Sequence, residues 1–288
     1  MAALQHLDER RGILYVFLAA LLWSTGGVAI KSVDAGPLVV SFYRSAIAAV
    51  VLFAFLRPRV KRWTPTFFLA VAGYAACLTT FVIATKWTTA ANAIFLQYMG
   101  VIWVMILSPL ILKEPLRKAD AIAVAVAFAG MALFFVEDFD PRGAAGNFVA
   151  ILSSIFFAML IIFLRAERDA SAEAAVTWGN VAVTLSLIPF VAGDLRVDLR
   201  SLLFLAFLGV FQIGLAYVFF VRGLRLVTAT KASLTGMVEP VMNPLWVFLL
   251  LGERPSPLAL LGGAIVLGAV TARTVWSGPQ TPPVPPPD

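Results

Sequence analysis

The chain has 288 residues, of which 61% are hydrophobic and only 13% are charged, and its mean hydropathy is +0.92. This composition lies far outside the range of soluble domains and predicts an all-α polytopic membrane protein. The formal net charge is +6, but the basic residues stand at the ends of apolar runs, which is typical of membrane orientation. The lipid bilayer is therefore the expected partner, and nucleic acid is not.

The residue types that carry most catalytic and metal chemistry are scarce. Cys77 is the only cysteine and lies within an apolar run, which excludes an intrachain disulfide and favours a packing role. His6 is the only histidine and belongs to the polar segment before the first run. The apolar runs supply no Ser/His/Asp set, metal cluster, carboxylate pair or nucleotide-binding motif, so we expect no enzymatic activity, no metal and no cofactor.

Apolar runs of about 20 residues, each long enough to cross a bilayer, follow one another with short polar connections. Ten such runs begin near Gly12, Pro37, Pro65, Thr89, Lys118, Gly146, Ala172, Leu199, Thr228 and Pro255. The first has no evident cleavage site and is expected to be retained. The proline-rich end, SGPQTPPVPPPD, is expected to be disordered.

Lysine and arginine are divided unequally between the two sets of alternating loops. Fourteen lie in the set that includes the amino-terminal segment, and six lie in the other set. The positive-inside rule therefore predicts that both termini are cytoplasmic, in a multi-pass protein of a bacterial-type inner (plasma) membrane.

The two halves of the chain repeat each other. FLAVAG at residues 68–73 matches FLAFLG at residues 204–209, and the run before Glu114 matches the run before Glu253. Two copies of five spans enter the membrane with opposite polarity, which is typical of transporters that hold substrate near the midplane. The predicted organisation is a cytoplasmic head (1–11), a first five-helix repeat (12–136), an external connection (137–145), a second five-helix repeat (146–276) and a disordered cytoplasmic tail (277–288).

The segment KASLTGMVEPVMNPLW, residues 231–246, places Glu239 in the middle of an apolar run. An ionisable group at that depth tends to face a bundle interior or a wet cavity. Pro240 and Pro244 each remove a helical N–H and predict a broken helix, and Asn243 lies one turn after Glu239. Two interpretations of Glu239 stay open: it binds a substrate ammonium or carries a proton, or it only stabilises the broken helix.

Other polar and aromatic groups lie deep in the runs. Arg44 is close enough to the external end of its run to reach the interface, and the alternatives are a substrate carboxylate or Glu239 as its partner. Gln97 and Gln212 need hydrogen bonds, which either helix pairing or substrate can supply. Deep aromatic rings suit a cavity for an aromatic solute or a cation, although helix packing is their commoner use. The predicted cavity residues are Trp23, Ser24, Arg44, Tyr74, Thr79, Gln97, Tyr98, Trp178, Gln212, Tyr217, Glu239 and Asn243, and the predicted hinge or broken-helix residues are Gly100, Pro240 and Pro244.

Several of these features resemble a known family. The ten runs, FYR at residues 42–44, EP at residues 239–240 and the glutamates after the fourth and ninth runs resemble the EamA-type branch of the drug/metabolite transporter superfamily, over roughly residues 12–276. AIFLQYMG, residues 93–100, is similar to bacterial aromatic amino acid exporters. The resemblance implies an inner-membrane carrier whose central cavity is lined mainly by spans one to four and six to nine, with spans five and ten peripheral.

The chain departs from the family pattern at one position. Val101 stands where relatives commonly have a proline, and the repeat alignment pairs Gly100 and Val101 with Glu239 and Pro240. The two half-sites are therefore chemically unequal, and a strictly mirrored hinge cannot be assumed.

The sequence therefore predicts a secondary transporter that exports small solutes, aromatic and other amino acids or related metabolites, by alternating access through a central cavity. A passive channel or facilitator for small solutes is the alternative, and an intramembrane enzyme or lipid scramblase has less support. A phosphorylated substrate would need several cavity cations, and only Arg44 is plainly intramembrane.

Overall fold

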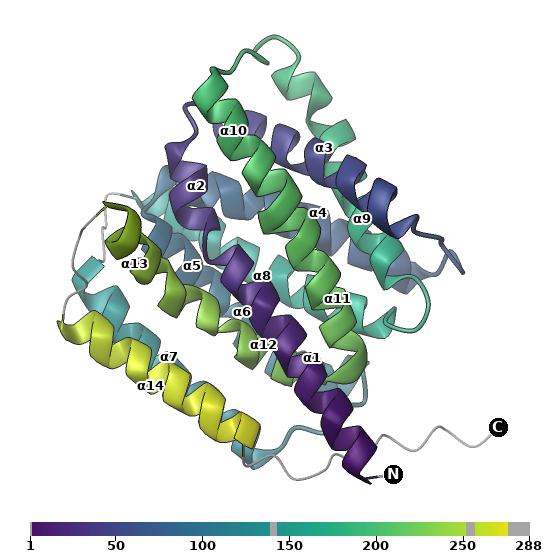
Figure 1. Cartoon of the computed structure of the whole chain (residues 1–288), viewed down its shortest axis with the longest axis vertical. Helices are drawn as coiled ribbons and strands as arrows, with labels where there is room; N and C mark the ends of the chain where they lie inside the picture. The colour runs from purple at the N-terminus through teal and green to yellow at the C-terminus, as the bar shows by residue number, and fades with distance from the viewer. Residues whose placement is uncertain (1, 139–142, 252–256, 276–288) are drawn as a thin grey trace.

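The computed structural model describes residues 2–138, 143–251 and 257–275, and every regular element within these ranges is helical (Figure 1). The first half contains α1 (Ala2–Trp23), α2 (Gly26–Ser32), α3 (Pro37–Leu56), α4 (Pro65–Trp87), α5 (Ala90–Tyr98), α6 (Gly100–Ile111) and α7 (Lys118–Asp138). The second half contains α8 (Ala144–Ala166), α9 (Ala172–Val191), α10 (Leu199–Phe207), a π-helix (Leu208–Leu215), α11 (Ala216–Leu226), α12 (Ala229–Gly236), α13 (Val238–Leu251) and α14 (Pro257–Val275).

Within the described residues, seven helical segments are long and apolar enough to cross a membrane. They are Leu7–Ser32, Pro37–Leu56, Pro65–Trp87, Ala90–Ile111, Ala144–Ala166, Ala172–Val191 and Leu199–Leu226. The prediction of an all-α, multi-pass membrane protein is confirmed at this level. Ten spans in two inverted repeats remain a prediction.

Some predicted boundaries differ from the observed ones. Helix α1 begins at Ala2, within the predicted head (1–11), and α7 ends at Asp138, beyond the predicted end of the first repeat. The division into head, repeats, connection and tail remains a prediction. Three predicted features lie outside the described residues: residues 139–142 of the predicted connection, the second glutamate of the repeated pattern (Glu253), and the predicted tail (277–288).

Side chains at the helix starts explain where several helices begin. Thr64, Thr89 and Asp198 accept hydrogen bonds from backbone N–H groups three residues further along, each at 3.0 Å, at the starts of α4, α5 and α10. Thr228 does the same for Lys231 at the start of α12, at 3.3 Å. Such caps satisfy N–H groups that the helix itself leaves without partners. At Asp198, the hydrogen bonds from Ser201 hold the pKa of the carboxyl below its usual range.

Several apolar runs are broken, and the breaks do not fall on the predicted residues. The first run breaks at Ser24 and Thr25, and the fourth breaks at Met99, directly before Gly100. The ninth breaks at Met237, three residues before Pro240, and Pro244 lies within α13. The reason is positional: Pro240 occupies the third position of α13, where a helix has no internal partner for an N–H, so the proline starts the second segment instead of ending the first.

The helices pack into one bundle with a distinct pair at its edge. Helix α4 packs along α8, α1 along α11, and α3 along α9. Helices α7 and α14 pack mainly on each other and lie together at one edge of the bundle (Figure 1). They correspond to the fifth and tenth runs, so the peripheral place implied by the family resemblance agrees with the structure.

Gly100 lets α6 and α8 approach closely. A Cβ atom at this position would lie 2.6 Å from the backbone oxygen of Ser154 and 2.8 Å from a ring carbon of Phe157. Contacts of that length do not occur between real atoms, so a side chain here would force the two helices apart. Glycine at this position is therefore required for packing, whatever its part in a hinge.

We predict that Gly100→Ala lowers the midpoint of thermal unfolding in detergent, because overpacking of a close helix contact costs about 1–3 kcal/mol. Gly268→Ala is the matched control, since nothing lies within 4 Å of a Cβ at that position in α14. There, alanine should leave the midpoint unchanged or raise it, because it favours a helix over glycine by roughly 0.5–1 kcal/mol. Equal midpoints for both variants would contradict the packing role of Gly100.

Candidate functional site

A cavity of about 40 Å³ lies among eight helical elements of the bundle. Its lining consists of Trp23, Arg44, Cys77, Leu78, Phe81, Gln97, Phe157, Gln212, Ile213, Tyr217 and Glu239. A water molecule needs at least about 10–15 Å³ of such space, so the cavity holds a few waters and is too small for an amino acid. Any larger solute therefore requires the walls to separate.

Arg44 is the buried cation of the cavity wall. Its side chain comes from α3 and the residue is only 1% exposed, so it does not reach the membrane interface as the sequence alone allowed. One terminal nitrogen donates to Gln212 Oε1 at 3.4 Å, and the other donates to the backbone oxygen of Leu78 at 3.2 Å. The guanidinium Nε has no hydrogen-bond partner among the described residues, and no ion pair joins Arg44 to Glu239 there. Its contacts are therefore neutral acceptors that leave the charge available.

The two cavity amides have different partners. Gln97 Nε2 donates to Ser153 Oγ at 2.8 Å, which ties α5 to α8. Gln212 accepts from Arg44 and lies in the π-helix, a type of segment that is frequent at functional sites. A Cβ at Gly26 would lie 2.7 Å from Gln212 Nε2, so the start of α2 leaves room for this amide. Both amides line the cavity while holding helices together.

Glu239 lines the cavity from α13 and is connected to the break in its own helix. In a continuous helix, the N–H of residue 240 would donate to the backbone oxygen of Gly236, four positions earlier. Pro240 has no N–H, so it cannot make this hydrogen bond. Tyr98 of α5 donates to that oxygen instead, at 2.6 Å, and its hydroxyl also lies 2.8 Å from Glu239 Oε2. The hydroxyl of one half of the chain thus satisfies the broken helix of the other half and contacts its carboxyl group.

Aromatic rings form one side of the cavity. Trp23 lies 5.0 Å from Tyr217 and 4.8 Å from Phe220, measured between ring centroids, and Tyr217 lies 4.7 Å edge-on from Tyr74. Trp23 and Tyr217 face the cavity, and the indole Nε1 of Trp23 has no hydrogen-bond partner among the described residues. The wall is therefore both aromatic and able to donate a hydrogen bond.

Half of the predicted cavity residues line the cavity, namely Trp23, Arg44, Gln97, Gln212, Tyr217 and Glu239. Tyr74 and Tyr98 lie directly behind this wall and are fully buried. Ser24 is buried at the break after α1, where its hydroxyl accepts from Trp246 Nε1 at 2.7 Å. Asn243 packs against Gly27, and its Oδ1 has no donor among the described residues.

The structure places two predicted cavity residues elsewhere. Trp178 is 39% exposed and packs edge-on against Phe53 and Trp63, so it belongs to the outer surface of the bundle. Thr79 is partly exposed and does not line the cavity. Depth along a span does not specify which face of the helix a residue occupies.

Five lining residues were not among the predicted ones: Cys77, Leu78, Phe81, Phe157 and Ile213. All five are hydrophobic, and their side chains carry no signal that separates a cavity wall from ordinary packing. Cys77 and Phe81 lie one turn apart on α4. The only signal in the sequence for these two residues is that polar residues predicted to line the cavity lie at a similar depth in neighbouring runs.

The fold is shared with a solved crystal structure that is 19% identical in sequence. The match covers 92% of this chain and 97% of that chain, with a TM-score of 0.80. At this identity the likeness concerns the fold alone.

Proteins of similar sequence are described as transporters. A pseudopaline exporter, CntI, of Pseudomonas aeruginosa is 26% identical over 274 residues, covering 91% of this chain and 95% of that protein. An uncharacterized transporter of Archaeoglobus fulgidus is 26% identical over 269 residues, covering 91% and 95%. An uncharacterized inner membrane transporter, YicL, of Salmonella typhimurium is 25% identical over 289 residues, again covering 91% and 95%.

A family model matches nearly the whole chain. The model of the EamA-like transporter family matches residues 10–136 and, a second time, residues 144–273. The two matches together span nearly all of the described helices, and the relatives agree with them. The chain belongs to the EamA-like transporter family of the drug/metabolite transporter superfamily and is a multi-pass membrane transporter.

Proposed function

We propose that this transporter exports small zwitterionic solutes, aromatic and other amino acids or related metabolites, by alternating access through the central cavity. One observation carries the proposal: Arg44 and Glu239 face the same cavity from α3 and α13 without forming an ion pair. A guanidinium binds a carboxylate with charge-assisted hydrogen bonds, and a carboxylate binds an ammonium. Arg44 therefore matches the carboxylate of an amino acid, and Glu239 in its ionised form matches the ammonium.

The aromatic side of the cavity supports a substrate with a ring or another apolar side chain. Trp23 and Tyr217 offer ring faces and edges, and each favourable aromatic contact contributes roughly 0.5–1.5 kcal/mol. The indole N–H of Trp23, which has no partner in the part of the chain that the structure describes, adds a hydrogen-bond donor beside these rings. A single buried cation in the described lining argues against a phosphorylated substrate, which would call for several.

The closed form of the cavity supports a carrier over a passive channel. About 40 Å³ leaves no room for a solute to pass through the bundle without a change of structure. We propose ten spans, with α7, α12 to α13, and α14 as the fifth, ninth and tenth. The 21 residues of α7 give a length of about 30 Å, which suits a span. The two matches of one family model support two related five-span repeats, and the loop charges support an inverted arrangement with both termini in the cytoplasm.

Glu239 is proposed to carry a proton in the conformation described. The Tyr98 hydroxyl has one hydrogen but lies within hydrogen-bond distance of two acceptors, Gly236 O and Glu239 Oε2. Both contacts are satisfied together only when Glu239 is protonated and donates to Tyr98. The other titratable or charged groups around Glu239 are Cys77 of α4, Tyr217 of α11 and Arg44 of α3. Loss of the proton would make Gly236 O and Glu239 compete for the single hydroxyl hydrogen of Tyr98, and would weaken the contact between α5 and the break before α13.

The first test is counterflow in proteoliposomes that contain the purified protein. Vesicles loaded with unlabelled phenylalanine should accumulate labelled phenylalanine or tryptophan transiently and saturably, because a carrier exchanges one bound solute for another. Protein-free vesicles provide the background. Linear flux that no unlabelled solute inhibits would overturn the carrier mechanism and favour a channel.

Arg44→Gln should weaken counterflow of zwitterionic amino acids by about ten- to a hundredfold in apparent affinity, because a hydrogen bond to a charged group contributes roughly 1.5–3 kcal/mol. The same variant should retain more of its affinity for the corresponding amines, which lack the carboxylate. Trp178→Leu is the control, since Trp178 lies on the outer surface, and it should transport like the unmodified protein. Equal losses for amino acids and amines would remove Arg44 as the carboxylate ligand.

Glu239→Gln should abolish the effect of an imposed pH gradient on the initial transport rate, because glutamine resembles the protonated carboxyl group and can donate to Tyr98 permanently. The unmodified protein, assayed in the same vesicles, should show rates that change with the gradient. A variant whose pH dependence is unchanged would exclude Glu239 as the proton carrier.

A further inference from the structure

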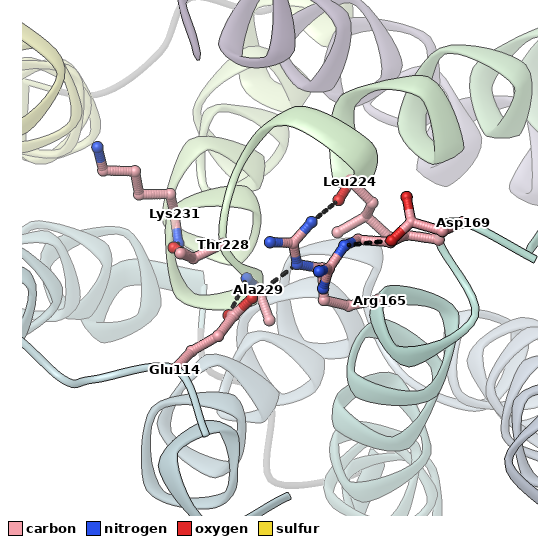
Figure 2. Close-up of polar contacts among 8 residues, drawn as sticks. Glu114, Arg165, Asp169, Leu224, Thr228, Ala229 and Lys231 are labelled. Atoms are coloured by element: carbon pink, nitrogen blue, oxygen red, sulfur yellow. Dashed lines mark hydrogen bonds and ion pairs between the residues drawn. The ribbon is translucent and has the colours of Figure 1, made fainter. Parts of the chain in front are cut away.

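A buried polar cluster outside the cavity connects helix ends from both halves of the chain. Figure 2 shows Glu114 between the side chain of Arg165 and the backbone of Ala229, with Leu224 on the far side of Arg165. Glu114 follows α6, Arg165 belongs to the last turn of α8, and Leu224 and Ala229 lie near the end of α11 and at the start of α12. The cluster therefore joins the first half of the chain to three elements of the second half.

Both oxygens of Glu114 are used. Arg165 Nε donates to Oε1 at 2.7 Å, and the backbone N–H of Ala229 donates to Oε2 at 2.9 Å. Arg165 also donates through a terminal nitrogen to the backbone oxygen of Leu224. The side chains of Arg165 and Glu114 are only 10% and 5% exposed. Removal of the carboxylate would leave a buried guanidinium and a helix N-terminus without their partner.

The local backbone directs Glu114 toward this position. Lys113, the preceding residue, has a φ of 55°, a left-handed conformation of the kind that ends a helix, and it follows the C-cap of α6 directly. The start of α12, which Thr228 caps, carries the positive end of a helix dipole, so a carboxylate there is favoured electrostatically. Charge, capping and chain direction therefore all act on one side chain.

A second ion pair lies on the first turn of the same helix. Lys231 of α12 pairs with Glu9 of α1, and both side chains are largely buried. This contact brings the start of α12 beside the amino-terminal part of α1, so both pairs occupy the end of the bundle where the chain begins. Glu9 and Glu114, both from the first half, hold one helix of the second half.

We propose that the Glu114–Arg165 and Glu9–Lys231 pairs form a gate that closes the cavity toward the amino-terminal end of the bundle. Opening at that end separates α12 from the first half and exposes all four charged groups to water. In the closed form, each charge is stabilised by its partner, and in the open form it is stabilised by water. Opening therefore costs less free energy than it would for an apolar contact, whose exposed surface gains nothing from water. The proposal rests on the proposed transport function, because a gate has meaning only for a protein whose cavity opens.

The chain carries its own reporter for this gate. Cys77 is the only cysteine, and it lines the cavity as a buried residue. The experiment measures the rate at which a charged, membrane-impermeant maleimide reacts with Cys77, by mass spectrometry, in inside-out and right-side-out membrane vesicles. Cys77→Ser gives the background of the assay. The reading depends on access to the cavity and requires no knowledge of the substrate.

Glu114→Gln should raise the reaction rate on the order of tenfold from the face that carries the amino terminus, and leave it unchanged from the opposite face. Asp120→Asn is the matched control. Asp120 pairs with Arg273 at 2.6 Å, and both side chains are 7% exposed, but this pair joins the peripheral helices α7 and α14. It should leave both rates unchanged.

Arg165→Lys provides a second variant if Glu114→Gln does not fold. Lysine keeps the positive charge but cannot reproduce the fork with which Arg165 bonds Glu114 and Leu224 together, so a rise of severalfold is expected from the same face. Unchanged rates for the folded gate variants, or an equal rise from both faces, would overturn the gate. Faster one-sided labelling in a protein that fails every counterflow assay would retain the gate and overturn the proposed substrate class.

Discussion

The structure depends on a constraint that the bilayer imposes: each backbone polar group within the hydrocarbon needs a partner inside the protein. Pro240 creates the central instance, because it leaves the backbone oxygen of Gly236 without its helical donor. Tyr98 supplies that donor from α5 and reaches Glu239 with the same hydroxyl. A single side chain therefore stabilises the break, positions the carboxyl group on the cavity wall and connects the two halves of the chain.

Charged side chains near the cavity and charged side chains at the amino-terminal end of the bundle have different kinds of partner. Near the cavity, the acceptors of Arg44 among the described residues are neutral, and Glu239 has a hydroxyl partner. At the amino-terminal end, Glu114 and Lys231 have charged partners. An ion pair inside the cavity would compete with a zwitterionic solute, whereas pairs at the end can exchange each other for water. Neutral partners near the cavity therefore leave Arg44 free to bind a solute, and charged partners at the amino-terminal end allow the contact there to open, in the transport cycle that we propose.

The sequence predicted the features that local chemistry determines. Apolar length predicted spans that the structure contains, and the depth of Gln97, Gln212 and Glu239 along their runs predicted that these three residues lie near one another, as they do around the cavity. The direction of a side chain around its helix was not predictable, so Trp178 was assigned to the cavity although it packs outside with Phe53 and Trp63. The pairing of Glu114 with Arg165, 51 residues away, depends on how α6 and α8 end in space, which no local pattern encodes.

The contact at Tyr98 also breaks the symmetry of the repeat. The alignment that pairs Gly100 with Glu239 pairs Tyr98 with Met237, the residue at the break in the ninth run. A thioether cannot donate a hydrogen bond, so Met237 cannot do for the fourth run what Tyr98 does for the ninth. Nor does the fourth run need it, because Val101, which aligns with Pro240, retains a backbone N–H. The two halves can therefore share one fold while only one of them carries, in the mechanism we propose, a break that responds to a proton. The two access states of such a carrier need not be equal in energy.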